Sequence, residues 1–197
     1  PGRLLLSVVK RENIFKSIAN WRHEYHDDFD VGEVLEAIKS LKGTKTGALI
    51  VFSRDTELKF YAQTGDALDA EVNKRLILSI FSKNSPLHDG AAIIHKGRIK
   101  AARCVLPVSE NDHIPATYGL RHRAAIGMSE NTDTLVVAIS EETGRLLLAR
   151  NGKYLRALKL KQVEQKILEY LHDDEPVRWE EIKEEESEAT EPTPAKG

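Results

Sequence analysis

The sequence is poor in cysteine. Cys104 is the single cysteine among 197 residues. One cysteine excludes an intrachain disulfide and is typical of a protein that works in a reducing compartment. We therefore expect Cys104 to be a small buried side chain in a strand, because a lone thiol more often fills apolar space than performs chemistry.

Long apolar runs are also missing. No stretch approaches the length needed to cross a bilayer, and Arg11 and Glu12 interrupt the only apolar start, so a signal peptide is not predicted. The chain begins at Pro1 without methionine, which leads us to expect an excerpt of a longer protein. No long basic stripe with interleaved aromatic residues is present, so we expect no nucleic acid as a partner.

What the chain does contain is the composition of a globular protein. Hydrophobic residues make up 41% and charged residues 30%, and 197 residues suffice for one well-buried domain with extensions. The net charge of −2 hides an uneven distribution, because residues 173–197 hold ten acidic and three basic residues. We predict an N-terminal connecting arm (1–30), a mildly basic folded domain (31–172) and an acidic disordered tail (173–197).

Hydrophobic periodicity predicts a single α/β domain with a mixed central β-sheet flanked by helices. The strands expected from apolar runs or alternation are 48–52, 58–62, 91–94, 99–106, 135–139 and 145–149. Turn residues pair the last four into two hairpins, through Lys96-Gly97 and through Glu142-Thr143-Gly144. The helices expected from helical spacing are 34–43, a helix capped by Asp69 and ending near Phe81, one starting at Ala124, and 160–171.

The segment 85–92, SPLHDGAA, places a carboxylate and an imidazole beside a glycine where a loop becomes an apolar strand. Asp89 can hold a divalent metal ion or accept a proton from a hydroxyl. His88 can share that ion only if the backbone is irregular, because neighbours on a strand point to opposite faces. Gly90 leaves room for a ligand to approach the backbone. The alternative is that Asp89 only closes a turn, a common role of Asp before Gly.

The segment 119–125, GLRHRAA, packs two guanidiniums and an imidazole into three residues. Arginine suits phosphate because its planar donors grip two oxygens at once. The tripeptide Arg121-His122-Arg123 stands directly before the expected helix start at Ala124, and helix N-termini attract anions. The alternative is a solvated basic turn that pairs with local acids. We favour a phosphate site, since a compact basic cluster beside small residues serves a solvated turn poorly.

Together these two segments resemble the paired DGA and RHR motifs of the diadenylate cyclases, enzymes that join two ATP into cyclic di-AMP. The resemblance extends through 104–107, CVLP, and 140–144, SEETG, and covers roughly residues 31–171. It is closest to the membrane-anchored bacterial branch of that family. It implies an α/β fold that agrees with the periodicity and identifies 31–172 as a catalytic domain.

The resemblance also implies site residues. Catalysis would rest on Asp89, Arg121, His122 and Arg123. Nucleotide binding would use Gly90, Ala91, Leu106, Gly119, Leu120, Ser140 and Glu142 together with the same basic tripeptide. A divalent cation (Mn, Mg or Co) would be held by Asp89 and His88. Relatives often carry threonine at Leu120, and Leu106 is otherwise an ordinary core leucine. For Glu141 we expect only a place in a polar hairpin turn.

Cyclic di-AMP has two equivalent phosphodiester bonds, so a chain with one ATP site needs a second copy opposite it. We therefore expect a face-to-face homodimer with ATP as substrate. The resemblance implies a cytoplasmic domain anchored to the cell membrane through a segment absent from this chain. Two other hypotheses stay open: a module that binds ATP or cyclic di-AMP without turnover, and a metal-dependent phosphohydrolase. The second would need more Asp and His ligands than the sequence offers.

Overall fold

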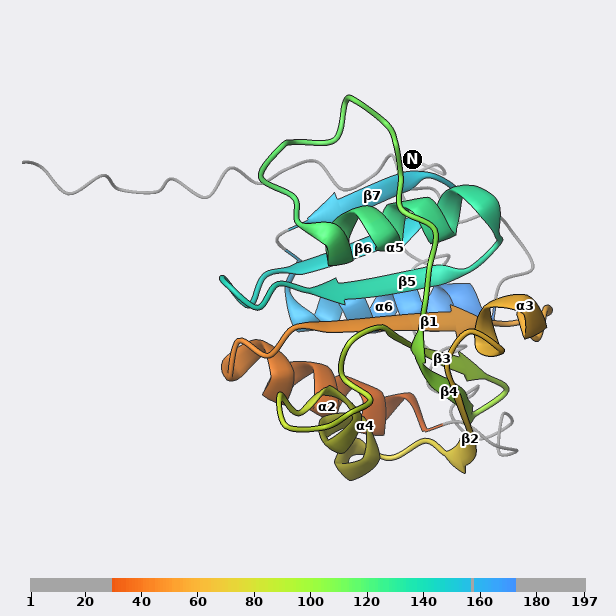
Figure 1. The fold of residues 1–197 in the computed structure, drawn as a ribbon. Coiled ribbons are helices and arrows are strands. Elements are labelled where there is room, and N and C mark those ends of the chain that lie inside the picture. The colour runs from red at the N-terminus through yellow and green to blue at the C-terminus, as the bar shows by residue number, and fades with distance from the viewer. Residues whose placement is uncertain (1–29, 157, 173–197) are drawn as a thin grey trace, which may run out of the picture.

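The computed structural model describes residues 30–156 and 158–172. Within them, seven strands form one mixed sheet between helices, as Figure 1 shows. The strands are β1 (Ala48–Ser53), β2 (Asp66–Glu71), β3 (Ala91–His95), β4 (Arg98–Cys104), β5 (Leu135–Ile139), β6 (Leu146–Arg150) and β7 (Lys153–Arg156). The helices are α2 (Val31–Gly43), α3 (Lys59–Ala62), α4 (Lys74–Phe81), α5 (Leu120–Asn131) and α6 (Leu160–Leu171). The predicted α/β domain with a mixed sheet is confirmed. The predicted tail, and the arm except for Asp30, lie outside the described residues.

The strand order is β2-β4-β3-β1-β5-β6-β7. β1 and β3 are parallel, and the other neighbouring pairs are antiparallel. Every residue of β1, β3, β5 and β6 is buried. That burial explains why these strands read as continuous apolar runs, since a central strand meets apolar neighbours on both of its faces.

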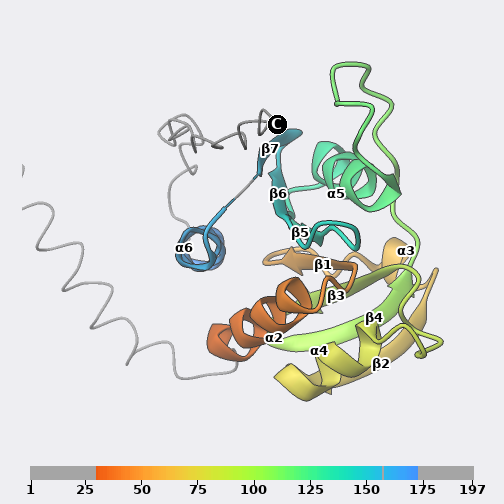
Figure 2. The ribbon, with the colours of Figure 1, turned by 90° about the vertical axis from the view of Figure 1, so that its left-hand side faces the viewer.

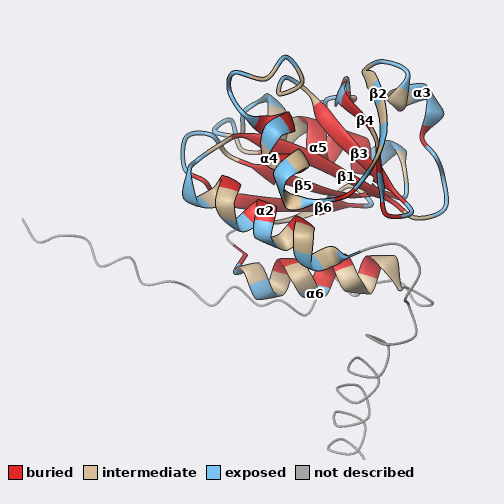
Figure 3. Cartoon of the chain, turned by 90° about the horizontal axis from the view of Figure 1, so that it is seen from below, coloured by how far each residue is buried: buried red, intermediate tan, exposed pale blue. Residues whose placement is uncertain are grey.

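Two hydrophobic cores lie on opposite faces of the sheet. Ile50 and Phe52 of β1 belong to the core that also contains residues of α2, α4 and α6. Leu49 and Val51 belong to the other core, which α5 covers together with residues at α3. This alternation is the period-2 geometry of a strand. Figure 2 shows α5 and the α2 and α4 pair on opposite sides of the sheet. In Figure 3 the central strands are buried, whereas α2 and α6 are buried along one side.

Two polar side chains fix where α2 and α4 begin. The Asp30 carboxylate accepts a hydrogen bond from the Gly32 amide at 2.8 Å at the start of α2. The Asn73 side chain accepts one from the Leu76 amide at 2.9 Å at the start of α4. The predicted cap at Asp69 is therefore wrong. Asp69 lies in β2, where its carboxylate forms ion pairs with Arg98 and Lys100 of the neighbouring strand.

Two other predicted elements need correction, and one strand was not predicted. Residues 58–62 do not form a strand: α3 occupies 59–62, and Phe60 at its surface is 75% exposed. Alternation over five residues does not separate a strand from a single helical turn. α5 begins at Leu120 rather than at Ala124, so the basic tripeptide lies inside its first turn. β7 was not predicted at all, because its four residues are half-buried or exposed.

Both ends of the described domain lie at the same edge of the sheet. Asp30 lies beside Gly97 of the β3–β4 turn, at the carboxyl end of β3. Near the end of α6, the Tyr170 hydroxyl accepts a hydrogen bond at 3.1 Å from the amide of Arg54, which directly follows β1. Because β1 and β3 are parallel, these two points share the edge at which both strands end.

Candidate active site

The sheet register brings the two sequence motifs to one edge. Ile50 of β1 pairs with Ala92 of β3, so Gly47 and Gly90 stand at the start of adjacent strands. Ala48 pairs with Ile139, which places Ser140 and the β5–β6 hairpin beside them. We call this the site edge. In Figure 1 it lies on the side toward which the β5 arrow points.

Gly90 is required by the backbone. Its φ angle is +148°, and a Cβ there would lie 2.6 Å from the carbonyl carbon of Arg103 in β4. The neighbouring strand fills the space on the side where that Cβ would lie, and the approach of a ligand to this glycine stays a prediction. Ala91 follows it as a buried residue paired with Cys104. Asp89, by contrast, is exposed at the site edge, where a ligand can reach its carboxylate.

His88 is half-buried, and a hydrogen bond orients its ring. Its Nδ1 lies 2.6 Å from the carbonyl oxygen of Ser85. Because a carbonyl oxygen can only accept, Nδ1 carries the hydrogen, and in the neutral ring Nε2 keeps its lone pair. Metal-binding histidines commonly have their other ring nitrogen fixed by such a bond. His88 therefore has the donor arrangement of a possible metal ligand next to the Asp89 carboxylate.

Arg121 reaches across the site edge to the β5–β6 hairpin. Its Nη1 donates to Glu141 Oε2 at 2.8 Å. The guanidinium also lies against Gly47, where an added Cβ would be 2.9 Å from both Cζ and Nη1. The expectation that Glu141 is only a turn residue therefore misses its contact. Gly47 was not identified from the sequence either. Many glycines precede a strand, and only the contact with Arg121 distinguishes this one.

The ring of His122 stacks on Tyr118 with centroids 5.0 Å apart, and Tyr118 in turn meets Tyr154 of β7 edge-on at 5.7 Å. Burial lowers the pKa of His122 below its ordinary value of 6.5; Glu142 raises it and Arg121 lowers it, both to a lesser degree. His122 is thus held neutral near pH 7 by its surroundings. Neither tyrosine was predicted: Tyr118 lies only four residues before His122, but no motif marks it, and Tyr154 comes from a strand that is distant in the sequence.

Arg123 contacts the loop 105–119, which precedes α5. Its guanidinium lies 3.5 Å from the Ser109 carbonyl oxygen and 3.4 Å from that of Ile114, and the Ser109 amide donates to the Arg123 carbonyl oxygen at 3.0 Å. The loop 105–119 also crosses α5 at Gly127, where a Cβ would lie 2.5 Å from the carbonyl oxygen of Pro107. Phosphate binding by Arg123 stays a prediction, beside a clear structural role in holding this loop.

The remaining predicted residues fall into two groups. Leu106 is buried among residues of the core under α5. Ser140 closes the hairpin, since its Oγ accepts from the Thr143 amide at 3.2 Å. The exposed residues are Gly119, Leu120 and Glu142, and the Leu120 side chain is 77% exposed. Their binding roles are not tested by these contacts and stay predictions.

Cys104 is 1% exposed, and burial is the main cause that raises the pKa of its thiol to about 11. The expectation of an inert strand residue is therefore confirmed.

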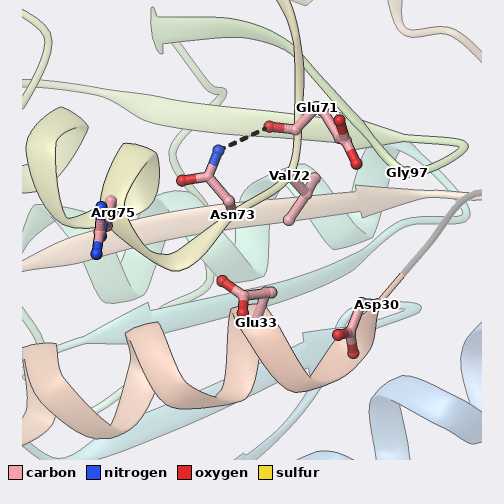
Figure 4. Close-up of a pocket in the computed structure, with 7 residues that line it drawn as sticks. All are labelled: Asp30, Glu33, Glu71, Val72, Asn73, Arg75 and Gly97. Carbon is pink, nitrogen blue, oxygen red and sulfur yellow. Dashed lines mark hydrogen bonds between the residues drawn. The ribbon is translucent and has the colours of Figure 1, made fainter.

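A hollow of about 530 Å³ lies away from the site edge. It is lined by Asp30, Glu33, Glu71, Val72, Asn73, Arg75 and Gly97, as Figure 4 shows. Its position at the other end of β3 separates it from both motifs. Three of its lining residues are carboxylates, which disfavours an anionic ligand there.

Among residues 30–156 and 158–172, no group of three or more His, Cys, Asp or Glu side chains is arranged to hold a metal ion. In the same described part of the chain, no helix combines the length and apolar character needed to span a bilayer.

A protein-family model described as "DAC: DisA bacterial checkpoint controller nucleotide-binding" matches residues 35–154. The chain belongs to this family. The matched range contains both motifs and all seven strands except the last two residues of β7. The match therefore includes the part of the domain that forms the site edge.

Curated members of the DAC family are similar to this chain over much of its length. The cyclic di-AMP synthase CdaA of Bacillus subtilis (strain 168) is 45% identical over 125 residues, which cover 64% of this chain and 46% of CdaA. A diadenylate cyclase of Listeria monocytogenes serotype 1/2a (strain 10403S) is 34% identical over 169 residues, covering 86% of this chain and 62% of that protein. The chain thus spans about half to three fifths of the length of these relatives.

Solved structures share the DAC fold seen here. The crystal structure of a double mutant of DacA from Staphylococcus aureus superposes with a TM-score of 0.70 at 38% identity, covering 72% of this chain and 94% of that chain. A hypothetical membrane spanning protein from Bacillus cereus gives a TM-score of 0.64 at 35% identity, covering 77% of this chain and 79% of that chain.

Proposed function

We propose that this chain is a diadenylate cyclase, which condenses two ATP into cyclic di-AMP and two pyrophosphates. The observation that carries the proposal is the meeting of segments 85–92 and 119–125 at one sheet edge in a member of the DAC family. These segments bring an exposed carboxylate and a basic helix start to the same place, and an adenylyl transfer between two nucleotides needs both.

Each bond of the product forms in the same way. The 3′-hydroxyl oxygen of one ATP attacks the α-phosphorus of the other, the bond from that phosphorus to the β-phosphate bridging oxygen breaks, and pyrophosphate leaves. The hydroxyl proton must go to a base, and Asp89 is the exposed carboxylate at the start of β3 that can accept it. Arg121 neutralises charge on the triphosphate as the leaving group forms.

A divalent cation fits this site if the nucleotide completes its coordination. Asp89 offers carboxylate oxygens and His88 an oriented Nε2, and Mg²⁺ sites are often built from one or two carboxylates plus substrate phosphates. The lack of a larger ligand group among the described residues is compatible with that arrangement. When bound, the cation would supply charge neutralisation on the phosphates. Oxygen ligands alone suit Mg²⁺, and the added imidazole favours Mn²⁺ or Co²⁺.

Product symmetry supports a homodimer. One chain carries one carboxylate segment and one basic segment, which accounts for one ATP. Two chains related by a two-fold axis supply two equivalent sites, and each nucleotide then meets the 3′-hydroxyl of the other. We further propose that the domain acts at a membrane, on the strength of its likeness to a structure described as membrane spanning.

Incubation with ATP and MnCl₂, followed by chromatography of the nucleotides, tests the proposal. Cyclic di-AMP is the expected product. Unchanged ATP with measurable ATP binding would instead identify a binding module, and release of ADP or AMP would identify a phosphohydrolase. Either result would overturn the assignment. The parallel reaction with MgCl₂ and CoCl₂ compares the three candidate ions.

A further inference from the structure

Arg121 and the two residues that surround its guanidinium come from three segments that are distant in the sequence. The arginine comes from the first turn of α5, Glu141 from the β5–β6 hairpin and Gly47 from the turn before β1. The Glu141 carboxylate lies 2.8 Å from Nη1, and a Cβ on Gly47 would lie 2.9 Å from Cζ and Nη1 of Arg121 and 3.1 Å from Cβ of Glu141. Arg121 and Glu141 therefore already pack together against Gly47 before any nucleotide binds.

A contribution to folding stability does not by itself explain this arrangement of Arg121, Glu141 and Gly47. The side chains of Arg121 and Glu141 are 24% and 56% exposed, and ion pairs at such exposure contribute little to folding. Gly47 does not have a left-handed backbone conformation, so its own geometry accepts any residue. A Cβ at position 47 would lie 2.9 Å from two atoms of the guanidinium and 3.1 Å from Cβ of Glu141, so a side chain there would push the guanidinium out of its present position.

We propose that Gly47 and Glu141 are positioning residues that hold Arg121 ready for the triphosphate. A guanidinium has five N–H donors in a fixed fork, and the bond to Glu141 uses only one nitrogen of that fork. The remaining donors stay available for phosphate oxygens. Fixing a flexible side chain in advance removes part of the ordering cost of binding. This inference rests on the proposed function, because it assigns the partner of Arg121 to a nucleotide phosphate.

The competing interpretation is that Glu141 occupies the phosphate position and must be displaced. The two interpretations predict opposite changes in affinity. If Glu141 positions the arginine, its removal weakens ATP binding. If Glu141 competes with phosphate, its removal strengthens ATP binding, and that outcome would overturn the proposal.

The test compares Gly47→Ala and Glu141→Ala with two matched controls. Gly43→Ala adds the same methyl group in the preceding helix, where nothing lies within 4 Å. Glu57→Ala breaks an exposed ion pair with Lys59 that lies after the carboxyl end of β1. ATP affinity is measured by calorimetry with a non-hydrolysable ATP analogue, and turnover by chromatography. We expect both site variants to bind roughly tenfold more weakly, and the controls to match the parent. Glu141→Gln should lie between Glu141→Ala and the parent.

Double mutants separate positioning from general damage. In an Arg121→Ala background the guanidinium is gone, so Gly47→Ala and Glu141→Ala should change ATP affinity less than twofold. Losses that add fully to that of Arg121→Ala would mean that the two residues act elsewhere and would overturn the proposal, as would parental affinity in both single variants. Thermal unfolding of each variant verifies that it is folded. A parent that binds ATP without forming cyclic di-AMP would refute the proposed function alone, and affinity would still decide on Gly47 and Glu141. A parent that binds no ATP would refute both.

Discussion

The two arginines of the basic tripeptide share one helical turn and make different contacts. Arg121 meets an exposed carboxylate and a glycine across the site edge. Arg123 meets two carbonyl oxygens of the loop 105–119, so its charge is used within the fold. Removing the charged donor of a half-buried carbonyl oxygen lowers the free energy of unfolding more than breaking a surface ion pair does. Identical side chains two residues apart therefore have different consequences when removed.

Alanine substitutions should separate these roles. Arg123→Ala should lower the free energy of unfolding by about 1–2 kcal/mol, because the loop loses two charge-assisted contacts. Arg121→Ala should change it by less than about 0.5 kcal/mol and weaken ATP binding roughly tenfold or more. Urea denaturation followed by circular dichroism gives the first quantity and calorimetry the second. Equal destabilisation by both variants would contradict this division.

Cys104 should resist alkylation in the folded protein. With a pKa of about 11 and 1% exposure, the thiol is mostly protonated at pH 8 and closed to reagents. Under conditions that label the urea-unfolded chain completely, we expect iodoacetamide to modify only a small fraction of the native chain, as measured by intact mass. Since the chain has one cysteine, each added carbamidomethyl group reports this site. Rapid labelling of native protein would show that β4 opens readily.

Among the elements, β7, the outermost strand next to β6, contributes a side chain to the surroundings of the site. Tyr154 of this strand meets Tyr118, and Tyr118 covers the ring of His122. The histidine owes its lowered pKa chiefly to burial. The folded state therefore favours the neutral ring, and this contribution to stability is complete above pH 6.5. It is lost as the pH falls from 6.5 through the lower pKa of the folded protein.

Removing the stacking ring should expose His122. In Tyr118→Ala we expect the pKa of His122 to rise toward 6.5, since solvent reaches the charged form more easily. A titration of the ring Cε1–H signal by NMR measures it, and a His122→Gln spectrum assigns the signal among seven histidines. Tyr154→Phe keeps the edge-on contact and should leave the value unchanged. The same pKa in Tyr118→Ala and the parent would show that other groups bury this histidine.

The elements that could be predicted are those whose signal is local. Buried β1 and β5 appear as apolar runs, and both hairpins carry a glycine at their turn. The errors arose where contact with another segment decides the outcome. The sequence predicts Asp69 as a helix cap, but its carboxylate pairs with Arg98 and Lys100 of β4. β7 pairs with the outer side of β6, and the sequence of β7 alone does not reveal this pairing.

The same division holds for the site. The motif residues around Asp89 and Arg121 were found from the sequence because their chemistry is concentrated in a few positions. Gly47 has no chemistry of its own, and its role follows only from a guanidinium that arrives from α5. The phosphate role of Arg123 stays a prediction, and its contacts with the carbonyl oxygens of the loop 105–119 could not be foreseen from the sequence.

At the scale of the whole molecule, the proposed function assigns to each chain one half of a symmetric reaction. If each bond forms between two chains, a folded Asp89→Asn protein that still binds ATP should suppress the parent when mixed in excess. Turnover should also rise more steeply than linearly with enzyme concentration until dimers saturate. Chromatography of cyclic di-AMP over a dilution series measures both effects. Activity strictly proportional to enzyme, without suppression and with a monomer in sedimentation, would contradict catalysis across a dimer.

Because Asp30 and the end of α6 share the edge opposite the site, both ends of the described domain lie away from the site edge. A domain held to a flat support at Asp30 would point its site edge away from that support. Two neighbouring domains in this orientation would hold their nucleotides side by side, with both sites facing away from the support. To bring them together, each domain must tip over by about a quarter turn. The freedom of each domain to tip, and not only the number of molecules on the support, would then set how often two sites meet.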